Sequence, residues 1–225
     1  MHPLDRPVWG TLTTAHAHLA VGGPLAWRFE PRVNLFASAR DDGGDCLAAL
    51  TALITTHGRS FIMQVPDIVI PATLHIAKHT RGVQMIVAGP LPEPDDTDTI
   101  VTMTESDVPE MVALATLTEP GPFLPRTHTM GRFLGIRIGG RLAAMAGERF
   151  RLPGYTELSG VCTHPDFRAL GLARRLSIAV AANIQASGES PFLHAWKTNQ
   201  AAIALYESIG FRIRAEVDVA VLDPP

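Results

Sequence analysis

The sequence predicts a mixed α/β (α+β) fold, in which strands and helices alternate along most of the chain. Hydrophobic residues make up 46% of the 225 residues and charged residues only 18%, which excludes collagen, a coiled coil and wholesale disorder. Short apolar runs bounded by Gly and Pro are typical of strands, and residues 172–186 form an Ala-rich run without a helix breaker. Charged residues, Pro or Gly interrupt every apolar run before it reaches the length of a membrane span.

Residues 1–90 are predicted to form an N-terminal α/β part, in which no chemical motif is visible. Helices are expected over residues 7–15 and 45–56, with Asp45 as the cap of the second and Gly58 at its end. The expected strands cover residues 26–29, 34–38, 60–65 and 82–88, and residues 73–79 fit either a strand or a helix.

A proline-rich segment divides the chain. Pro90, Pro92 and Pro94 alternate with other residues and an acidic stretch follows them, so residues 91–98 are predicted to be a semi-rigid linker. The chain therefore separates into an accessory part, residues 1–90, and a second part, residues 99–225.

The second part has a clearer pattern. A strand over residues 99–103 leads to Thr104, which is suited to cap a helix, and a Pro- and Gly-rich loop follows over residues 119–129. Gly139 and Gly140 supply the positive φ angles of a tight turn between strands 132–138 and 141–150. The remaining elements are expected in this order: strand 155–163, helix 172–186, strand 191–196, helix 199–209, and strands 211–213 and 216–222.

The loop between strand 155–163 and helix 172–186 is a candidate phosphate site. Backbone N–H groups at a helix N-terminus attract anions, and the glycine at position 171 lets a phosphate approach the backbone closely. Arg168 and Arg174 add positive charge. Neither a P-loop nor a G-x-G-x-x-G fingerprint is present, and the segment instead spells R-x-x-G-x-A from Arg168 to Ala173.

This motif and the residues after it resemble the GNAT superfamily of acetyl-CoA-dependent N-acyltransferases. Pro165 and Arg168 precede the loop as in that family, and Asn199, Tyr206 and the pair Gly210-Phe211 follow in the family's order. The resemblance covers about residues 99–222, with Ala169 standing where many members have Gly. It implies a mostly antiparallel, twisted sheet flanked by helices. Residues 1–90 resemble the accessory halves of tandem or glycine N-acyltransferase-like members, and a degenerate GNAT-like half is one interpretation of them.

The resemblance also implies a reaction and its residues. An amine would attack the thioester of acetyl-CoA directly in a ternary complex, with Tyr206 protonating the departing thiolate. Glu157 is our candidate base, acting through water, and Glu148 is the reserve. The cosubstrate would be held by the strand end, the loop and the second helix, at Val161, Cys162, Thr163, Arg168, Ala169, Leu170, Gly171, Leu172, Ala173, Arg174 and Asn199.

Other readings of these residues remain open at this stage. A non-enzymatic CoA-binding sensor would keep the loop and tolerate the loss of Tyr206, and a plain protein-interaction domain would bind no CoA. A nucleophile set of Cys162, His164 and Asp166 is a minor alternative, because Pro165 and the turn disturb their alignment. Tyr206 could also pack in the core, and Asn199 could serve only as a helix cap.

Charge and cysteine content narrow the partners. The net charge of −3 does not suggest a nucleic acid, and two cysteines with scattered histidines do not make a metal site. We expect a small-molecule or peptide amine as acceptor, no membrane partner, and either a monomer or a homodimer. The first residues lack the apolar core of a signal peptide, so a reducing cytoplasm is the expected location.

Overall fold

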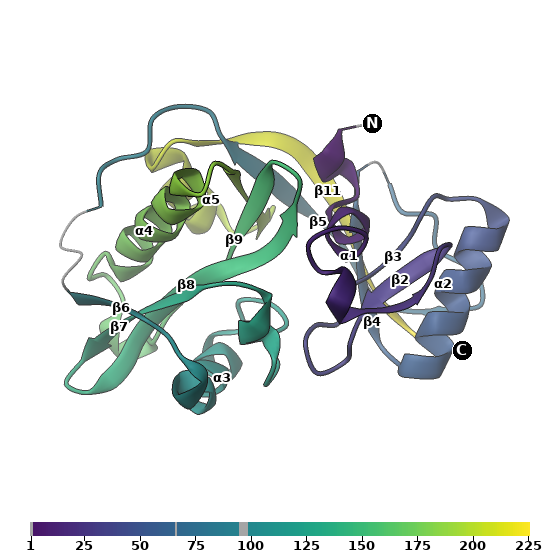
Figure 1. Ribbon diagram of the computed structural model, residues 1–225, viewed down its shortest axis with the longest axis horizontal. Coiled ribbons are helices and arrows are strands. Elements are labelled where there is room, and N and C mark those ends of the chain that lie inside the picture. The colour runs from purple at the N-terminus through teal and green to yellow at the C-terminus, as the bar shows by residue number, and fades with distance from the viewer. Residues whose placement is uncertain (1, 66, 95–98) are drawn as a thin grey trace.

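The computed structural model describes residues 2–65, 67–94 and 99–225. Within these described ranges eleven strands form two sheets, and helices flank them (Figure 1). The small sheet has the order β1-β2-β3, and the large one the order β4-β11-β5-β10-β9-β8-β7-β6. In the large sheet β9 and β10 run parallel, while the other described pairs are antiparallel. The predicted fold class, a mixed and mostly antiparallel sheet with flanking helices, is confirmed.

The N-terminal elements agree with the sequence patterns in type and differ in extent, except for β1, which was not predicted. They are α1 (Pro7–Leu12), β1 (Ala20–Gly23), β2 (Ala26–Phe29), β3 (Ala37–Ala39), α2 (Gly44–His57), β4 (Ser60–Gln64) and β5 (His75–Val87). Gly43, not Asp45, is the N-cap of α2, while Gly58 ends this helix at φ +82° as expected. Residues 75–79 belong to β5, whose 13 residues join two separately predicted segments, and residues 73 and 74 precede the strand.

The second part follows its predicted order closely. It contains β6 (Ile100–Thr102), α3 (Val108–Thr118), β7 (Phe133–Ile138), β8 (Arg141–Leu152), β9 (Tyr155–Thr163), α4 (Leu172–Ala186), β10 (Ser190–Trp196), α5 (Gln200–Ser208) and β11 (Phe211–Asp223). Gly139 and Gly140 form the β7–β8 turn at φ +58° and +80°. Thr104 caps the 3-10 turn before α3, where its backbone N–H donates to the Asp107 carboxylate over 2.8 Å.

The large sheet is continuous across the predicted linker. β5, from the N-terminal part, lies between β10 and β11 and pairs with both. β4 pairs with β11 at the end of the same sheet. Residues 95–98 of the predicted linker lie outside the described residues, and the proposed division into 1–90, 91–98 and 99–225 stays a prediction.

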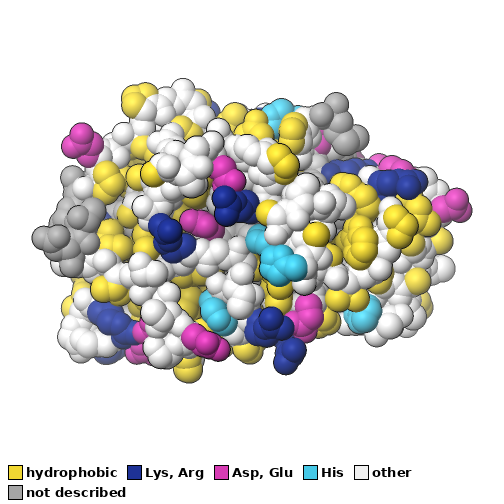
Figure 2. Space-filling model, viewed as in Figure 1, with side chains coloured by type: hydrophobic (Ala, Val, Ile, Leu, Met, Phe, Trp, Pro, Cys, Tyr) yellow, Lys and Arg dark blue, Asp and Glu magenta, His cyan; other side chains and the backbone are white. Residues whose placement is uncertain are grey.

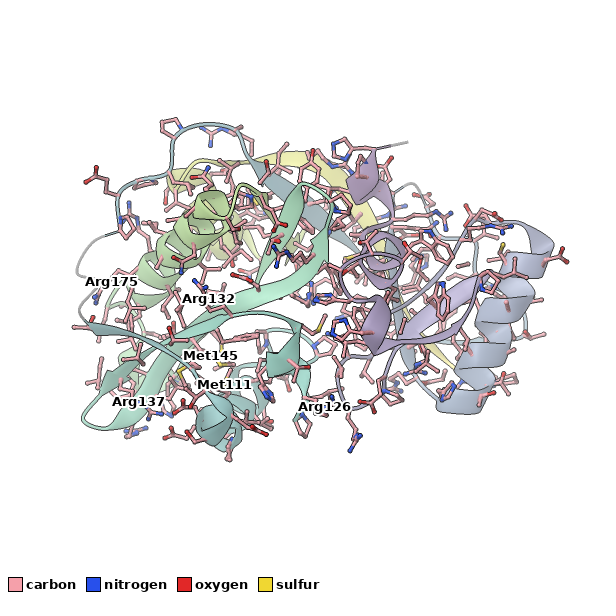
Figure 3. All side chains as sticks on the ribbon, viewed as in Figure 1. Met111, Arg126, Arg132, Arg137, Met145 and Arg175 are labelled. Carbon is pink, nitrogen blue, oxygen red and sulfur yellow. The ribbon has the colours of Figure 1, made fainter. Side chains whose placement is uncertain are left out.

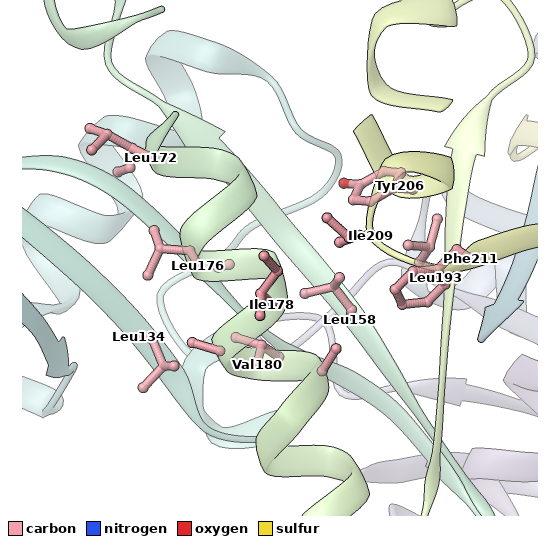
Figure 4. Close-up of a cluster of buried hydrophobic side chains, with 14 of the residues drawn as sticks. Leu134, Leu158, Leu172, Leu176, Ile178, Val180, Leu193, Tyr206, Ile209 and Phe211 are labelled. Carbon is pink, nitrogen blue, oxygen red and sulfur yellow. The ribbon is translucent and has the colours of Figure 1, made fainter. Parts of the chain in front are cut away.

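Separate apolar clusters fill the space on the faces of the sheets. The largest is formed by α4, α5 and the central strands, with Leu176, Ile178 and Phe211 among its fully buried members (Figure 4). A second cluster joins α1 and the small sheet to β8, β10 and β11. Met111 of α3 and Met145 of β8 belong to a third, beneath α3 (Figure 3). The central strands are thus covered on both faces, which holds their backbones in fixed positions.

Acidic and basic side chains are interspersed over the face shown in Figure 2, with apolar side chains between them. This mixed distribution agrees with the small net charge of −3. No helix in the described part of the chain is long and apolar enough to cross a bilayer.

Candidate active site

The candidate site is a pocket between β9 and β10. The two strands pair over Ser190–Phe192 and Tyr155–Glu157, and the described pairing ends there. Beyond this point a pocket of about 230 Å³ lies between residues 158–161 of β9 and 194–196 of β10. On one side α5 and the residue before it line the pocket with Asn199, Ala202 and Tyr206. A gap between two parallel strands leaves backbone groups of β9 available to a ligand.

A bulge in β9 shapes this wall of the pocket. Met145 of β8 lies opposite Cys162, but Gly147 lies opposite Ser159, so β9 has one residue more than its partner. Gly160 sits in the bulge at φ +64°, and a Cβ there would come within 3.0 Å of the Phe133 ring. The bulge breaks the simple alternation under which Glu157, Ser159, Val161 and Thr163 would share one face. As a result residues 158–161 all line the pocket, while Cys162 packs beneath α3.

The loop that precedes α4 has the geometry of an anion site. Residues 168–171 are exposed, and Gly171 is the N-cap of the 15-residue helix at φ +72°, with no side-chain cap. The N–H of Arg175 donates to the carbonyl of Gly171, so the N–H groups of Leu172 and Ala173 precede the first intrahelical bond. Ala169 also has a positive φ of 64°, which is costly for a residue with a Cβ and gives the loop a tight turn.

Two observations show that these residues fit a CoA-like ligand. A Cβ added at Gly171 would meet no atom within 4 Å, so the space before α4 is open. The hydroxyl of Thr163, at the end of β9, is buried without a hydrogen-bond partner among the described residues. A buried hydroxyl is normally paired, so this one is suited to a hydrogen bond with a ligand.

Tyr206 of α5 lines the pocket and is 8% exposed. Its ring packs edge-on against Phe211, with centroids 6.1 Å apart. In the view of Figure 4 its hydroxyl is directed toward α4 and not toward Phe211. Burial, with a smaller contribution from Cys162, raises the pKa of Tyr206 well above its usual value, so the phenol keeps its proton throughout the physiological range.

Asn199 combines a structural role with a place in the pocket. Its side-chain oxygen accepts from the N–H of Ala202 over 3.1 Å, which makes it the N-cap of α5. It also lines the pocket. Both roles suggested by the sequence are therefore compatible with its position.

Glu157 lies behind the pocket wall in a buried network of charges. Its side chain is fully buried, and Arg149 donates to both carboxylate oxygens over 2.7 Å. Nδ1 of His194 lies 2.6 Å from Oε1 of the same carboxylate. Burial alone would raise the pKa of Glu157, but the charge and hydrogen bonds of Arg149, together with His194, outweigh burial and lower it to about 2. So weak a base at neutral pH is poorly suited to accept a proton from an ammonium.

His194 is fixed in its neutral form by neighbours on both sides. Nε2 of Gln84 donates to the carbonyl of Leu4 over 2.9 Å, and the guanidinium of Arg214 donates to Oε1 of Gln84. This orientation makes Nε2 of Gln84 the donor toward Nε2 of His194, 2.9 Å away. The imidazole therefore accepts from Gln84 and donates to Glu157. Burial lowers the pKa of His194, which agrees with the neutral form.

The remaining sequence candidates lie away from the pocket lining. The carboxylate of Glu148 accepts from the backbone N–H of Arg132 over 3.4 Å. Burial raises the pKa of the Cys162 thiol to about 11, so little thiolate forms at neutral pH. His164 accepts from the N–H of Asp166 as the cap of a 3-10 turn. The described contacts do not join Cys162 to His164, and the alternative nucleophile set has no support.

Sequence reasoning missed Arg149, His194 and the contribution of the N-terminal part. Arg149 and His194 both line the pocket, yet each occurs in an otherwise unremarkable strand pattern. The signal available in the sequence was that each of these two residues stands next to an apolar residue, Phe150 or Leu193, that is buried in the sheet. Phe36, Phe61 and Met63 could not be assigned, because only the three-dimensional sheet brings β4 to the pocket. In the described residues, no group of three His, Cys, Asp or Glu side chains is placed to hold a metal ion.

Comparison with known proteins places the chain in a family. The family model described as FR47-like protein matches residues 133–219. A crystal structure from Novosphingobium aromaticivorans, of a protein classed as an acetyltransferase of the GNAT family, is 42% identical, with a TM-score of 0.93 and 100% coverage of both chains. No curated protein matches the sequence.

More distant structures share the fold. A GCN5-related N-acetyltransferase from Kribbella flavida has a TM-score of 0.66 at 17% identity, covering 100% of this chain and 97% of its own. A GCN5-related N-acetyltransferase-like protein from Streptococcus suis has a TM-score of 0.57 at 13% identity, covering 96% and 92%. Full-length similarity at 42% identity, together with the strand gap, the R-x-x-G-x-A loop and the position of Tyr206, leads to one conclusion: this chain belongs to the GNAT family of N-acetyltransferases.

Proposed function

We propose that this protein transfers an acetyl group from acetyl-CoA to the primary amine of a small molecule or peptide, by direct attack in a ternary complex. The observation that carries the proposal is the pocket between β9 and β10. Tyr206 lines this pocket, and the exposed N-terminus of α4 follows β9 along the chain. GNAT acetyltransferases use acetyl-CoA in general, and the open loop and unpaired Thr163 hydroxyl fit it.

The cosubstrate would be held by three parts of the chain. The N–H groups of residues 169–174 would receive its phosphates, assisted by the helix dipole and the exposed Arg168. Backbone groups of Val161, Cys162 and Thr163 would pair with its arm. Asn199 would contact it from α5. When bound, acetyl-CoA supplies the acetyl group as an activated thioester.

The residues of the pocket would then handle protons and orientation. The amine nitrogen bonds to the acetyl carbonyl carbon, the carbon–sulfur bond breaks, and CoA departs as a thiol. The Tyr206 phenol, kept protonated by burial, donates the proton that the sulfur needs. The ammonium loses one proton to water at the open mouth of the pocket before it attacks, and the nitrogen loses a second proton to water as the amide forms. The phenol is reprotonated from the same solvent.

We assign Glu157 a positioning role within this site. Its carboxylate holds the guanidinium of Arg149 and the imidazole of His194, both of which line the pocket. Its lowered pKa weighs against the role of direct base that the sequence suggested. The non-enzymatic CoA sensor remains the competing function, and it predicts that no amine is acetylated even though CoA binds.

Thermal unfolding with and without acetyl-CoA tests the cosubstrate. A ligand at 100 times its Kd adds about 2.7 kcal/mol, which for a chain of this length raises Tm by about 6 °C. Gly171→Glu should abolish this rise by placing a carboxylate at the phosphate site. Gly188→Glu is the matched control, because Gly188 also has positive φ and open space but lies beyond the other end of α4. Equal rises in the two variants would remove the loop assignment.

Measuring the release of CoA in the presence of amines distinguishes an acetyltransferase from a non-enzymatic CoA sensor. Amine-dependent CoA release supports acetyl transfer. Stabilisation by acetyl-CoA with no release for any amine in a broad panel would favour the sensor.

A further inference from the structure

The pocket has a second end, to which the N-terminal part contributes as many residues as the region that carries the family motif. Phe36 and the β4 residues Phe61 and Met63 come from the N-terminal part, and β10 and β11 supply the rest. We call this surface the apolar wall; it consists of Phe36, Phe61, Met63, Trp196, Val217 and Val219. It belongs to the cluster that joins the small sheet to the large one, on the face of the sheet opposite α4 and α5.

The apolar wall is rigid and partly open. Phe36 packs edge-on against the buried Phe150, with ring centroids 5.2 Å apart, and lies 5.5 Å from the ring of Phe61. Phe61 and Trp196 are only partly buried, so their rings leave surface for a ligand. An apolar cavity of about 150 Å³ is large enough to hold benzene. The pocket, at about 230 Å³, therefore has room for an aromatic ring beside the reacting atoms.

The charges of the pocket favour an amine without a carboxylate. The guanidinium of Arg149 is held by Glu157 and lies over the rings of Phe36 and Phe150, 4.9 Å and 4.5 Å from their centroids. His194 is neutral, as argued above. Glu119, at the end of α3, is exposed and lines the pocket, and the described ion pairs do not include it. The lining thus offers one uncompensated negative charge at the mouth, which attracts an ammonium and repels a carboxylate.

We propose that the acceptor is a primary amine with a bulky apolar body, aromatic or branched, and without a carboxylate, whose body rests on the apolar wall. This inference rests on the proposed acetyl transfer. It assigns the N-terminal part a direct role in acceptor specificity, through Phe36, Phe61 and Met63.

The test compares three acceptors of matched chemistry on the full-length protein. 2-Phenylethylamine has an apolar body, ethylamine lacks it, and phenylalanine adds a carboxylate. We expect kcat/KM for 2-phenylethylamine to exceed that for ethylamine at least ~10-fold, since apolar groups in such pockets discriminate by that order. Phenylalanine should be a poorer acceptor than 2-phenylethylamine. Values for ethylamine and 2-phenylethylamine within threefold of each other would overturn the proposal, as would a preference for phenylalanine.

Variants locate the preference at the apolar wall. Phe61→Ala should reduce the ratio between the two amines at least ~5-fold while leaving KM for acetyl-CoA unchanged. Tyr155→Ala is the matched control, because Tyr155 is a half-buried aromatic residue of the same cluster that does not line the pocket. An equal change of the ratio in both variants would refute the role of the wall.

A binding measurement on the wild-type protein makes the test independent of turnover and of folding defects. Calorimetry with the CoA complex should detect 2-phenylethylamine and show at least ~10-fold weaker binding of ethylamine. No binding of 2-phenylethylamine to a protein that acetyl-CoA still stabilises would overturn the acceptor class and leave the proposed function standing. Absence of stabilisation by acetyl-CoA would overturn both.

Discussion

Replacing Glu157 by Gln tests the buried network that supports the pocket. The substitution keeps the shape of the side chain but leaves the positive charge of Arg149, which is 12% exposed, without its partner. Removing one member of a buried ion pair costs about 3–5 kcal/mol. The shift of the Glu157 pKa from 4.5 to about 2 gives an independent figure of about 3 kcal/mol at neutral pH.

These free energies translate into a measurable change in Tm. With an unfolding entropy of about 2.1 cal/mol/K per residue, a chain of 225 residues loses about 2 °C per kcal/mol. Glu157→Gln should therefore unfold about 6–10 °C below the wild type at pH 7. Glu148→Gln, on the neighbouring strand and without an ion pair among the described residues, should shift Tm by less than about 2 °C.

The pH dependence supplies the decisive check. Because folding lowers the pKa of Glu157, its stabilisation is complete above the unfolded value of 4.5 and is lost as the pH falls toward about 2. The difference in Tm between wild type and Glu157→Gln should therefore narrow steadily below pH 5. A difference under 2 °C at pH 7, or one that is constant from pH 7 to pH 3, would refute this account of the network.

Four further outcomes are expected. Tyr206→Phe should lower kcat about 100-fold or more with little change in KM for acetyl-CoA, measured by CoA release, whereas Tyr155→Phe should not. With no enzyme base, kcat/KM for the amine should rise about tenfold per pH unit from pH 6 to 9; a plateau near pH 7 would indicate a titrating base. Asn199→Ala should cost about 1 kcal/mol through the lost cap, or about 2 °C in Tm. Cys46 and Cys162 are buried, so iodoacetamide should label them at pH 8 only after unfolding, as mass spectrometry would show.

Local patterns predicted the local parts of this structure well. The predicted helix over residues 172–186 has the observed bounds of α4, and the Gly139-Gly140 turn and the Asn199 cap follow from rules that involve only neighbouring residues. β11 was predicted as two strands, because its register shift between Ile213 and Ala215 disturbs the alternation of the sequence. β1 was missed, since Val21 is its one bulky apolar side chain.

Sequence patterns identified only part of the candidate site. The loop before α4 and the α5 residues follow one another along the chain, so order alone identifies them. The expected position of Glu157 on one face of the sheet assumed that side chains alternate regularly along the strand. The bulge at Gly160 breaks this alternation. The partners of Glu157 come from β8 and β10, and the N-terminal members of the apolar wall lie more than a hundred residues before Trp196. Contacts of this range leave no periodic signal in the sequence.

The position of β5 between β10 and β11 has a consequence for the order in which the protein can fold during synthesis. Both neighbours of β5 are translated after it, because β10 begins at Ser190 and β11 at Phe211. The strand must therefore wait, with its hydrogen-bonding edges unpaired, until residues 190–223 have left the ribosome. Such long-range pairing favours slow folding and exposes the nascent chain to aggregation. Truncations that end before β10 should accordingly be insoluble, and the full-length protein should refold more slowly than a helical protein of equal length.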